Sequence, residues 1–160
     1  MGIEWADHLV FDESDKSVTF IHSKHKKVAN SASDLHEVVG QAIKNLGYMW
    51  FTNTLFEAKQ EKFGRTYNGS NVRSSVPRCR TGDINNLVPF VINLQKDPHL
   101  IRKCVICCTF LSKSQLEVEF QKIKDGKKVG AQIPQIFWII SSFVHASKEM
   151  NIVPEVYCVA

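Results

Sequence analysis

The sequence predicts an α+β fold: a single domain spanning residues 1–160, with an antiparallel or mixed sheet packed against about three helices. Apolar segments of strand length occur at Ser17–Ile21 and at residues 100–111. Apolar residues recur with helical spacing between Leu35 and Leu46. A last apolar segment, Gln135–Met150, has the length of a helix, so strands and helices are expected in one chain of ordinary domain size.

The first elements follow from local patterns. Leu9–Phe11 and Ser17–Ile21 flank a polar segment, which predicts two antiparallel strands joined by a tight turn. The helix that follows has Ser31 or Ser33 as its cap and Gly47 as a left-handed stop. Its apolar positions lie at i, i+3, i+4, i+7, i+8 and i+11: Leu35, Val38, Val39, Ala42, Ile43 and Leu46.

The middle of the chain is less regular. Tyr48–Phe56 is rich in aromatic residues and threonine and predicts a strand, although Leu55–Phe63 fits a short helix equally well. Residues 64–83 combine three glycines with asparagine, serine, Pro77 and arginines, which predicts a long irregular excursion with a turn at Asn68–Ser70. Asp83 is then placed to cap a helix whose regular part is delayed by Pro89.

The last third contains the predicted central strand, residues 100–111, which is apolar on both faces. Alternation at residues 116–121, followed by Asp125-Gly126, predicts a hairpin that continues into residues 127–133. Pro134 suits the start of a final helix over Gln135–Met150, and the tail, residues 152–160, is expected to form a strand.

Composition places the protein among folded intracellular chains. Hydrophobic residues make up 44% and charged residues 22% of the sequence, which resembles ordinary globular proteins. We expect no transmembrane segment and no signal peptide, because no apolar run is long enough for either. The odd number of cysteines, five, argues against a disulfide framework and favours a cytoplasmic or nuclear location without secretion.

The cysteines of Arg102–Leu111 are the strongest candidates for chemistry. Cys104 and Cys107 have C-x-x-C spacing, but residues i and i+3 of a strand point to opposite faces, which disfavours a zinc site. The apolar context favours buried, inert thiols, and no histidine has a recognisable catalytic partner. We therefore predict no enzyme, no catalytic residue, no metal ligand and no cofactor; a cysteine-dependent enzyme or zinc protein is an alternative.

Basic side chains suggest the binding function. The net charge of +4 favours a polyanionic partner if the cations share one face. Clusters occur at His22–Lys27, in the 64–83 loop, at Arg102-Lys103 and around Asp125-Gly126, and a common rim of all four would attract phosphates. The predicted phosphate contacts are Lys24, Lys26, Lys27, Arg73, Arg78 and Arg80. Tyr67 is placed to stack on a base.

These observations predict a non-catalytic assembly protein, viral or structural, that forms a homo-oligomer and binds RNA or an anionic lipid surface. The final helix is apolar on every side over Ile136–Ile140, so it needs partners all round. An alternative is therefore a protein-interaction adaptor that uses this helix and the C-terminal tail.

Overall fold

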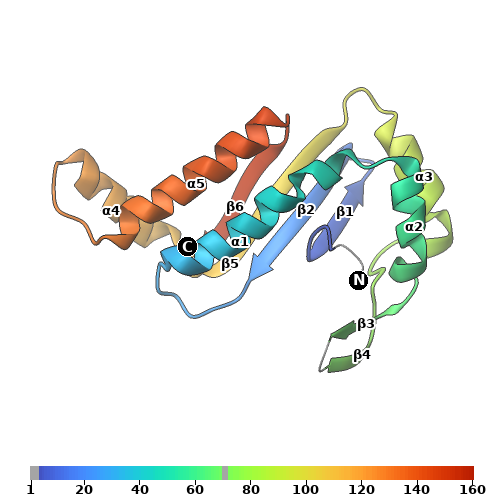
Figure 1. Ribbon diagram of the computed structural model, residues 1–160, viewed down its shortest axis with the longest axis horizontal. Helices are drawn as coiled ribbons and strands as arrows, with labels where there is room; N and C mark the ends of the chain where they lie inside the picture. The colour runs from blue at the N-terminus through green and yellow to red at the C-terminus, as the bar shows by residue number, and fades with distance from the viewer. Residues whose placement is uncertain (1–3, 70–71) are drawn as a thin grey trace. The chain divides into compact units, whose positions relative to one another are not determined.

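The computed structural model describes residues 4–69 and 72–160 (Figure 1). The α+β class is confirmed: the described residues form five α-helices, a four-stranded mixed sheet and a two-stranded sheet. The expectation of about three helices was therefore too low. The chain divides into two compact units, Met1–Met49 with Ile101–Ala160, and Trp50–Leu100. The assignment of residues 1–160 to a single domain stays a prediction.

The first unit is built on a sheet with the strand order β1-β2-β5-β6. β1 (His8–Asp12) pairs antiparallel with β2 (Ser17–Lys24), which confirms the predicted hairpin. β5 (Ile101–Ser112) lies between β2 and β6 (Val153–Val159) and is parallel to both. The predicted central strand and the predicted strand-forming tail are therefore also confirmed.

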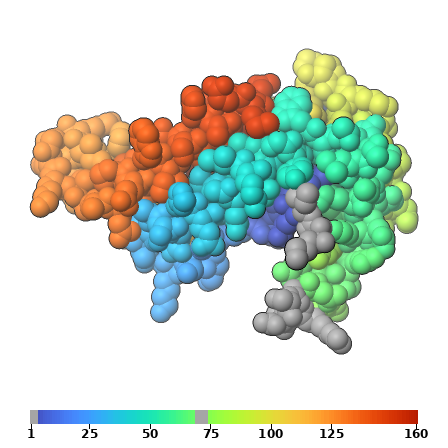
Figure 2. Space-filling model, in the orientation of Figure 1, coloured from blue at the N-terminus to red at the C-terminus, as the bar shows by residue number. Residues whose placement is uncertain are grey.

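Two helices, α1 (Ala32–Asn45) and α5 (Gln132–Glu149), lie side by side on one face of this sheet (Figure 1). Figure 2 shows their side chains meeting without a visible gap on the face toward the viewer. Ser31 caps α1, since its hydroxyl accepts a hydrogen bond from the amide of Asp34 at 3.2 Å. Gly47 does not stop the helix as expected, because the backbone continues into a 3-10 helix, η1 (Leu46–Trp50).

The core of the first unit lies between the sheet and these helices. The register pairs Phe20 with Cys104 and His22 with Ile106, so these side chains share the face that meets α1 and α5. Phe20 and Ile106 are almost completely buried, and each such side chain contributes about 1.5–3 kcal/mol. The opposite face keeps exposed apolar side chains, namely Val10, Ile101, Val153 and Tyr157.

The predicted hairpin around Asp125-Gly126 is wrong. Lys113–Lys124 form an α-helix, α4, whose start is capped by the hydroxyl of Ser112. Leu116, Phe120 and Ile123 also follow helical spacing, so the alternation that suggested a strand fitted both periods. Gly126 has φ +68, and it ends the helix instead of forming a hairpin turn.

The second unit begins with a helix: the strand predicted at Tyr48–Phe56 is wrong, and the alternative helix at Leu55–Phe63 is confirmed. α2 (Asn53–Phe63) is capped by the hydroxyl of Thr52, which accepts from the amide of Leu55 at 3.3 Å. Phe56 is completely buried and packs against Phe51 and Phe63, with ring centroids 5.1 and 5.6 Å away. Aromatic packing inside a helical unit therefore overrides the strand propensity of these residues.

The rest of the second unit holds a helix and a hairpin. Asp83 accepts a hydrogen bond from the amide of Asn85 at 2.9 Å and caps η2 (Ile84–Asn86), which leads into α3 (Leu87–Gln95). Residues 64–83 are not irregular throughout, because β3 (Thr66–Gly69) and β4 (Val72–Pro77) pair antiparallel. The turn predicted at Asn68–Ser70 includes Ser70, which lies outside the described residues.

Candidate functional site

The predicted lysine contacts lie at the carboxyl end of β2, and two of them are paired. Lys24 forms ion pairs with Asp34, at 3.3 Å, and with Glu37, and its side chain is only 15% exposed. The hydrogen bond to Glu37 is the main reason that the pKa of Lys24 is raised. Lys26 lies 3.5 Å from the same Asp34, whereas Lys27 is exposed and has no ion-pair partner in the described part of the chain. The acidic start of α1 therefore offsets much of this positive charge.

The predicted arginine contacts lie in the second unit. Arg73 is on β4 opposite Asn68, but its side chain lies outside the described part. Arg78 and Arg80 follow the end of β4, and both are exposed. Because the lysines and arginines belong to different units, the predicted common rim of all basic clusters stays a prediction.

These arginines lie in a stretch of sequence without acidic residues, although Glu61, just before it, forms an ion pair with Arg65. Residues 62–82 contain five cationic side chains and no aspartate or glutamate, whereas the whole chain has a net charge of +4. The remainder of the protein is therefore close to neutral. The positive charge of this chain is concentrated on the β3–β4 hairpin and its flanks.

The hairpin gathers part of this charge on one face. The amide of Arg78 donates to the carbonyl oxygen of Arg65 at 3.0 Å, which continues the register of the neighbouring strand pair and sets the two residues opposite each other. Tyr67 follows Arg65 by two residues and lies on the same face. The guanidinium of Arg78 stands over the Tyr67 ring, 5.4 Å from its centroid. We call Arg65, Tyr67 and Arg78 the arginine face.

Other basic side chains form local pairs. Arg102 donates from Nε to the carbonyl oxygen of Met49 at 3.0 Å, and burial lowers its pKa. Lys127 pairs with Asp125 at 3.1 Å, and Lys124 stands over the ring of Phe120. Arg102 lies on the central strand β5, and Lys124 and Lys127 lie at and just after the end of α4. The lysines around Asp125-Gly126 therefore do not form the hairpin tip that the sequence suggested.

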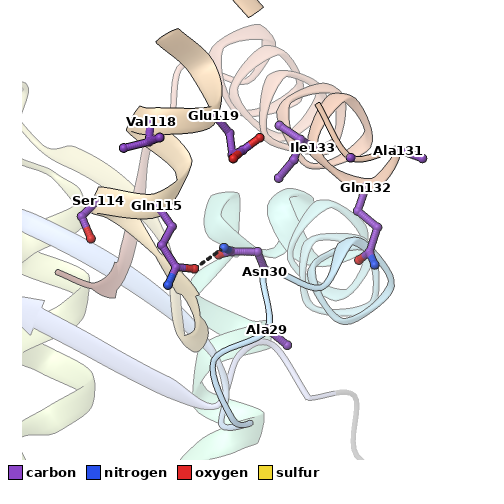
Figure 3. A pocket seen from close by; sticks show the side chains of 10 residues that line it. Ala29, Asn30, Ser114, Gln115, Val118, Glu119, Ala131, Gln132 and Ile133 are labelled. Carbon is purple, nitrogen blue, oxygen red and sulfur yellow. Dashed lines mark hydrogen bonds between the residues drawn. The ribbon is translucent and has the colours of Figure 1, made fainter. Parts of the chain in front are cut away.

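A depression of about 740 Å³ opens at the carboxyl end of β5 (Figure 3). Asn30 is its main organising residue and has a left-handed backbone with φ +44. Its Oδ1 accepts from the amide of Ser112 at 2.9 Å, and its Nδ2 donates to Oε1 of Gln115 at 2.7 Å. The lining residues are Ala29, Asn30, Ser114, Gln115, Val118, Glu119, Gly130, Ala131, Gln132 and Ile133.

The depression is not suited to an anion, although α1, α4 and α5 all begin beside it. The amide of Ala32 already donates to Oε1 of Gln132 at 3.3 Å, and the hydroxyl of Ser112 accepts from Gln115. The charged lining residue is Glu119, which repels anions. The sequence analysis did not predict the depression at the end of β5. Asn30 could have indicated it, because asparagine directly before a helix cap tolerates a positive φ.

The cysteine-rich strand separates its thiols between two environments. Cys104 and Cys108 are buried on the helix-covered face, and burial raises their pKa to about 12 and about 11. Cys107 is exposed on the other face, so the expectation of burial is wrong for this residue. The predicted separation of positions i and i+3 is confirmed. Within residues 4–69 and 72–160, histidine, cysteine and carboxylate side chains form no group of three suited to a metal.

His22 does not belong to the surface cluster in which the sequence placed it. It is only 2% exposed, and its Nε2 has no hydrogen-bond partner among the described residues. Burial lowers the pKa of His22; Asp7 opposes this shift, and Lys44 adds to it. A neutral imidazole is therefore part of the core between β2 and α1.

Comparison of the chain with protein-family models, with curated proteins and with solved structures found no match. Among the helices of the described segments, none combines the length and apolar character needed to cross a lipid bilayer.

Proposed function

We propose that this protein is a non-catalytic assembly protein that binds a polyanion through the arginine face and its neighbours and associates with further copies of itself. The observation that carries the proposal is the cross-strand pair Arg65–Arg78 within a segment that has no acidic residue. Like charges directly opposite on a strand pair are unfavourable. Glu61 forms an ion pair with Arg65 and neutralises that one charge. Among the described residues, the positive charge of the other arginines in the segment is not neutralised in this way, and it favours an anionic ligand.

Guanidinium groups suit this role because each can form two parallel hydrogen bonds to one phosphate. Arg80 is exposed two residues beyond Arg78, and it remains among the proposed phosphate contacts. Lys26, Lys27 and Arg73 remain proposed phosphate contacts. Lys24 contributes only if the ligand displaces its two carboxylate partners, Asp34 and Glu37. The five free cysteines support residence in a reducing compartment, the cytoplasm or nucleus.

Salt-dependent binding tests this proposal. Full-length protein is titrated with labelled RNA, with heparin and with phosphatidylserine vesicles at several salt concentrations. The variant R65A/R78A/R80A is compared with K113A/K128A/K148A, which removes the same charge from exposed lysines elsewhere. For RNA, we expect the magnitude of the negative slope of log K against log salt to decrease by about 2 in the arginine variant only. Equal losses in both variants would show that net charge, and not the arginine face, determines binding.

The self-association part of the proposal is supported by the sheet face opposite α1 and α5. Its exposed apolar side chains are Val10, Ile101, Val153 and Tyr157, with exposed fractions of 42%, 42%, 44% and 58%. Lys103 and Glu155 place both signs of charge on the same face, which suits a self-complementary contact. Light scattering on nuclease-treated protein tests this part, and a strict monomer at high concentration contradicts it.

An adaptor role is the second candidate function. Trp138 on α5 is 77% exposed, the most of any large apolar side chain described. It lines a depression of about 580 Å³ together with His36 and Pro134. Exposed tryptophan beside a hollow is typical of protein-binding hot spots. Capture of a protein partner that persists in high salt, and is lost in W138A, would favour this function over polyanion binding.

A further inference from the structure

The arginine face carries an aromatic ring among its cations. We propose that the polyanion is a single-stranded nucleic acid and that one of its bases stacks on Tyr67, an inference that rests on the proposed function. Tyr67 is 51% exposed, and it lies on the same side of the hairpin as Arg65 and Arg78. A cationic groove with an exposed aromatic ring is the usual way in which proteins hold single strands.

The Arg78 guanidinium supports one side of the ring. It lies 5.4 Å from the centroid, within the range of a cation–π contact. A base on the free side of the ring would complete a stack of guanidinium, phenol and base. Holding Tyr67 in place before binding reduces the entropy that the ligand must offset.

An irregularity in the hairpin interrupts the strand pairing at Tyr67. Thr66 pairs with Pro77 and Asn68 with Arg73, so three residues of β4 stand opposite Tyr67 alone. Local hydrogen bonds hold this bulge: the amide of Ser74 donates to Oδ1 of Asn68 at 3.4 Å, and the amide of Val76 to Oγ of Ser74 at 3.0 Å. Bulges of this kind redirect side chains beside binding sites. Among the described residues, Tyr67 consequently has no partner in the register of the two strands.

The same geometry disfavours the other polyanions. Bases in a duplex already stack on one another and do not offer a face to a side chain. Heparin and anionic lipids have no bases, so they can use Arg65 and Arg78 but gain nothing from the flat ring. Tyr67 is therefore expected to distinguish single strands from every other ligand of this surface.

Three variants of the full-length chain test the inference. Y67F keeps the flat ring, Y67L keeps apolar bulk against Arg78 without a ring, and Y67A removes both. Each variant and the original protein are titrated with labelled single-stranded RNA of mixed sequence, the corresponding duplex, and heparin, and the original protein also with phosphatidylserine vesicles. We expect Y67L and Y67A to weaken single-strand binding between about 5-fold and about 150-fold, with Y67F near the original protein. Duplex and heparin binding should change less than about 2-fold in Y67L and Y67F.

The outcomes distinguish a failure of base stacking on Tyr67 from a failure of the proposed polyanion binding. Equal losses for single strand, duplex and heparin in Y67L would overturn stacking and leave polyanion binding intact. Unchanged single-strand binding in Y67A would do the same. If the original protein binds vesicles but neither RNA nor heparin, both the stacking and the nucleic-acid ligand are wrong. If the original protein binds neither RNA, nor heparin, nor vesicles, the proposed polyanion binding itself is wrong. Circular dichroism melting of each variant shows whether the hairpin change has altered folding.

Discussion

Replacing Asn30 tests how the loop between β2 and α1 is held to the end of β5. Its side chain satisfies the amide of Ser112 at 2.9 Å and donates to Gln115 at 2.7 Å, while its backbone has φ +44. N30G keeps the backbone conformation but removes both hydrogen bonds. We expect a loss of about 2 kcal/mol in the free energy of unfolding, most of it from the part-buried Ser112 amide left without an acceptor.

Two further substitutions divide this effect into parts. N30A keeps a β-carbon in the left-handed region but lacks the polar side chain that lets asparagine tolerate this conformation. Relative to N30G this costs about 1–2 kcal/mol, partly offset by the lower freedom of alanine in the unfolded chain. We expect N30A to be about 1 kcal/mol less stable than N30G. N30D retains the acceptor for Ser112 and should lose only about 0.5–1 kcal/mol.

Urea denaturation followed by far-ultraviolet circular dichroism measures these differences. With a slope of about 2 kcal/mol per molar urea, N30G should unfold at about 1 M less urea than the original protein. Two results would contradict this account: N30G as stable as the original protein, or N30A at least as stable as N30G. The first result would show that the Asn30 hydrogen bonds do not contribute to stability. The second would show that the positive φ of residue 30 does not disfavour alanine.

Two more predictions concern buried groups of the first unit. Burial lowers the pKa of His22, so as the pH falls the unfolded chain binds a proton at this residue before the folded protein does. The free energy of unfolding is therefore unaffected by protonation of His22 above its ordinary pKa of 6.5 and decreases as the pH drops below that value. In H22L, the denaturation midpoint should depend less on pH between about pH 8 and pH 5. If H22L shows the same pH dependence as the original protein, His22 is not a buried neutral imidazole. In native protein, iodoacetamide should label Cys107 first, because burial protects Cys104 and Cys108 and raises their pKa. Mass spectrometry identifies the labelled sites, and early labelling of Cys104 argues against the described core.

Elements whose local signals agree are predictable from the amino-acid sequence. At α1, helical spacing and a serine cap coincide, and the structure places the helix at Ala32–Asn45. The continuous apolar run after Arg102-Lys103 indicated a strand with neighbours on both sides, and β5 is central. Pro134 and the apolar segment after it located α5. In each case, periodicity, capping and burial indicate the same structure, so few alternatives remain.

Elements whose patterns fit two periods depend instead on contacts between distant segments. α4 contains apolar residues at spacings that suit a strand or a helix, and in α2 aromatic packing among Phe51, Phe56 and Phe63 overrides strand propensity. The opposition of Arg65 and Arg78 was likewise invisible, because it depends on a strand register across an irregular hairpin. Local patterns report what one segment prefers, whereas register and pairing depend on contacts between segments that a linear pattern does not contain.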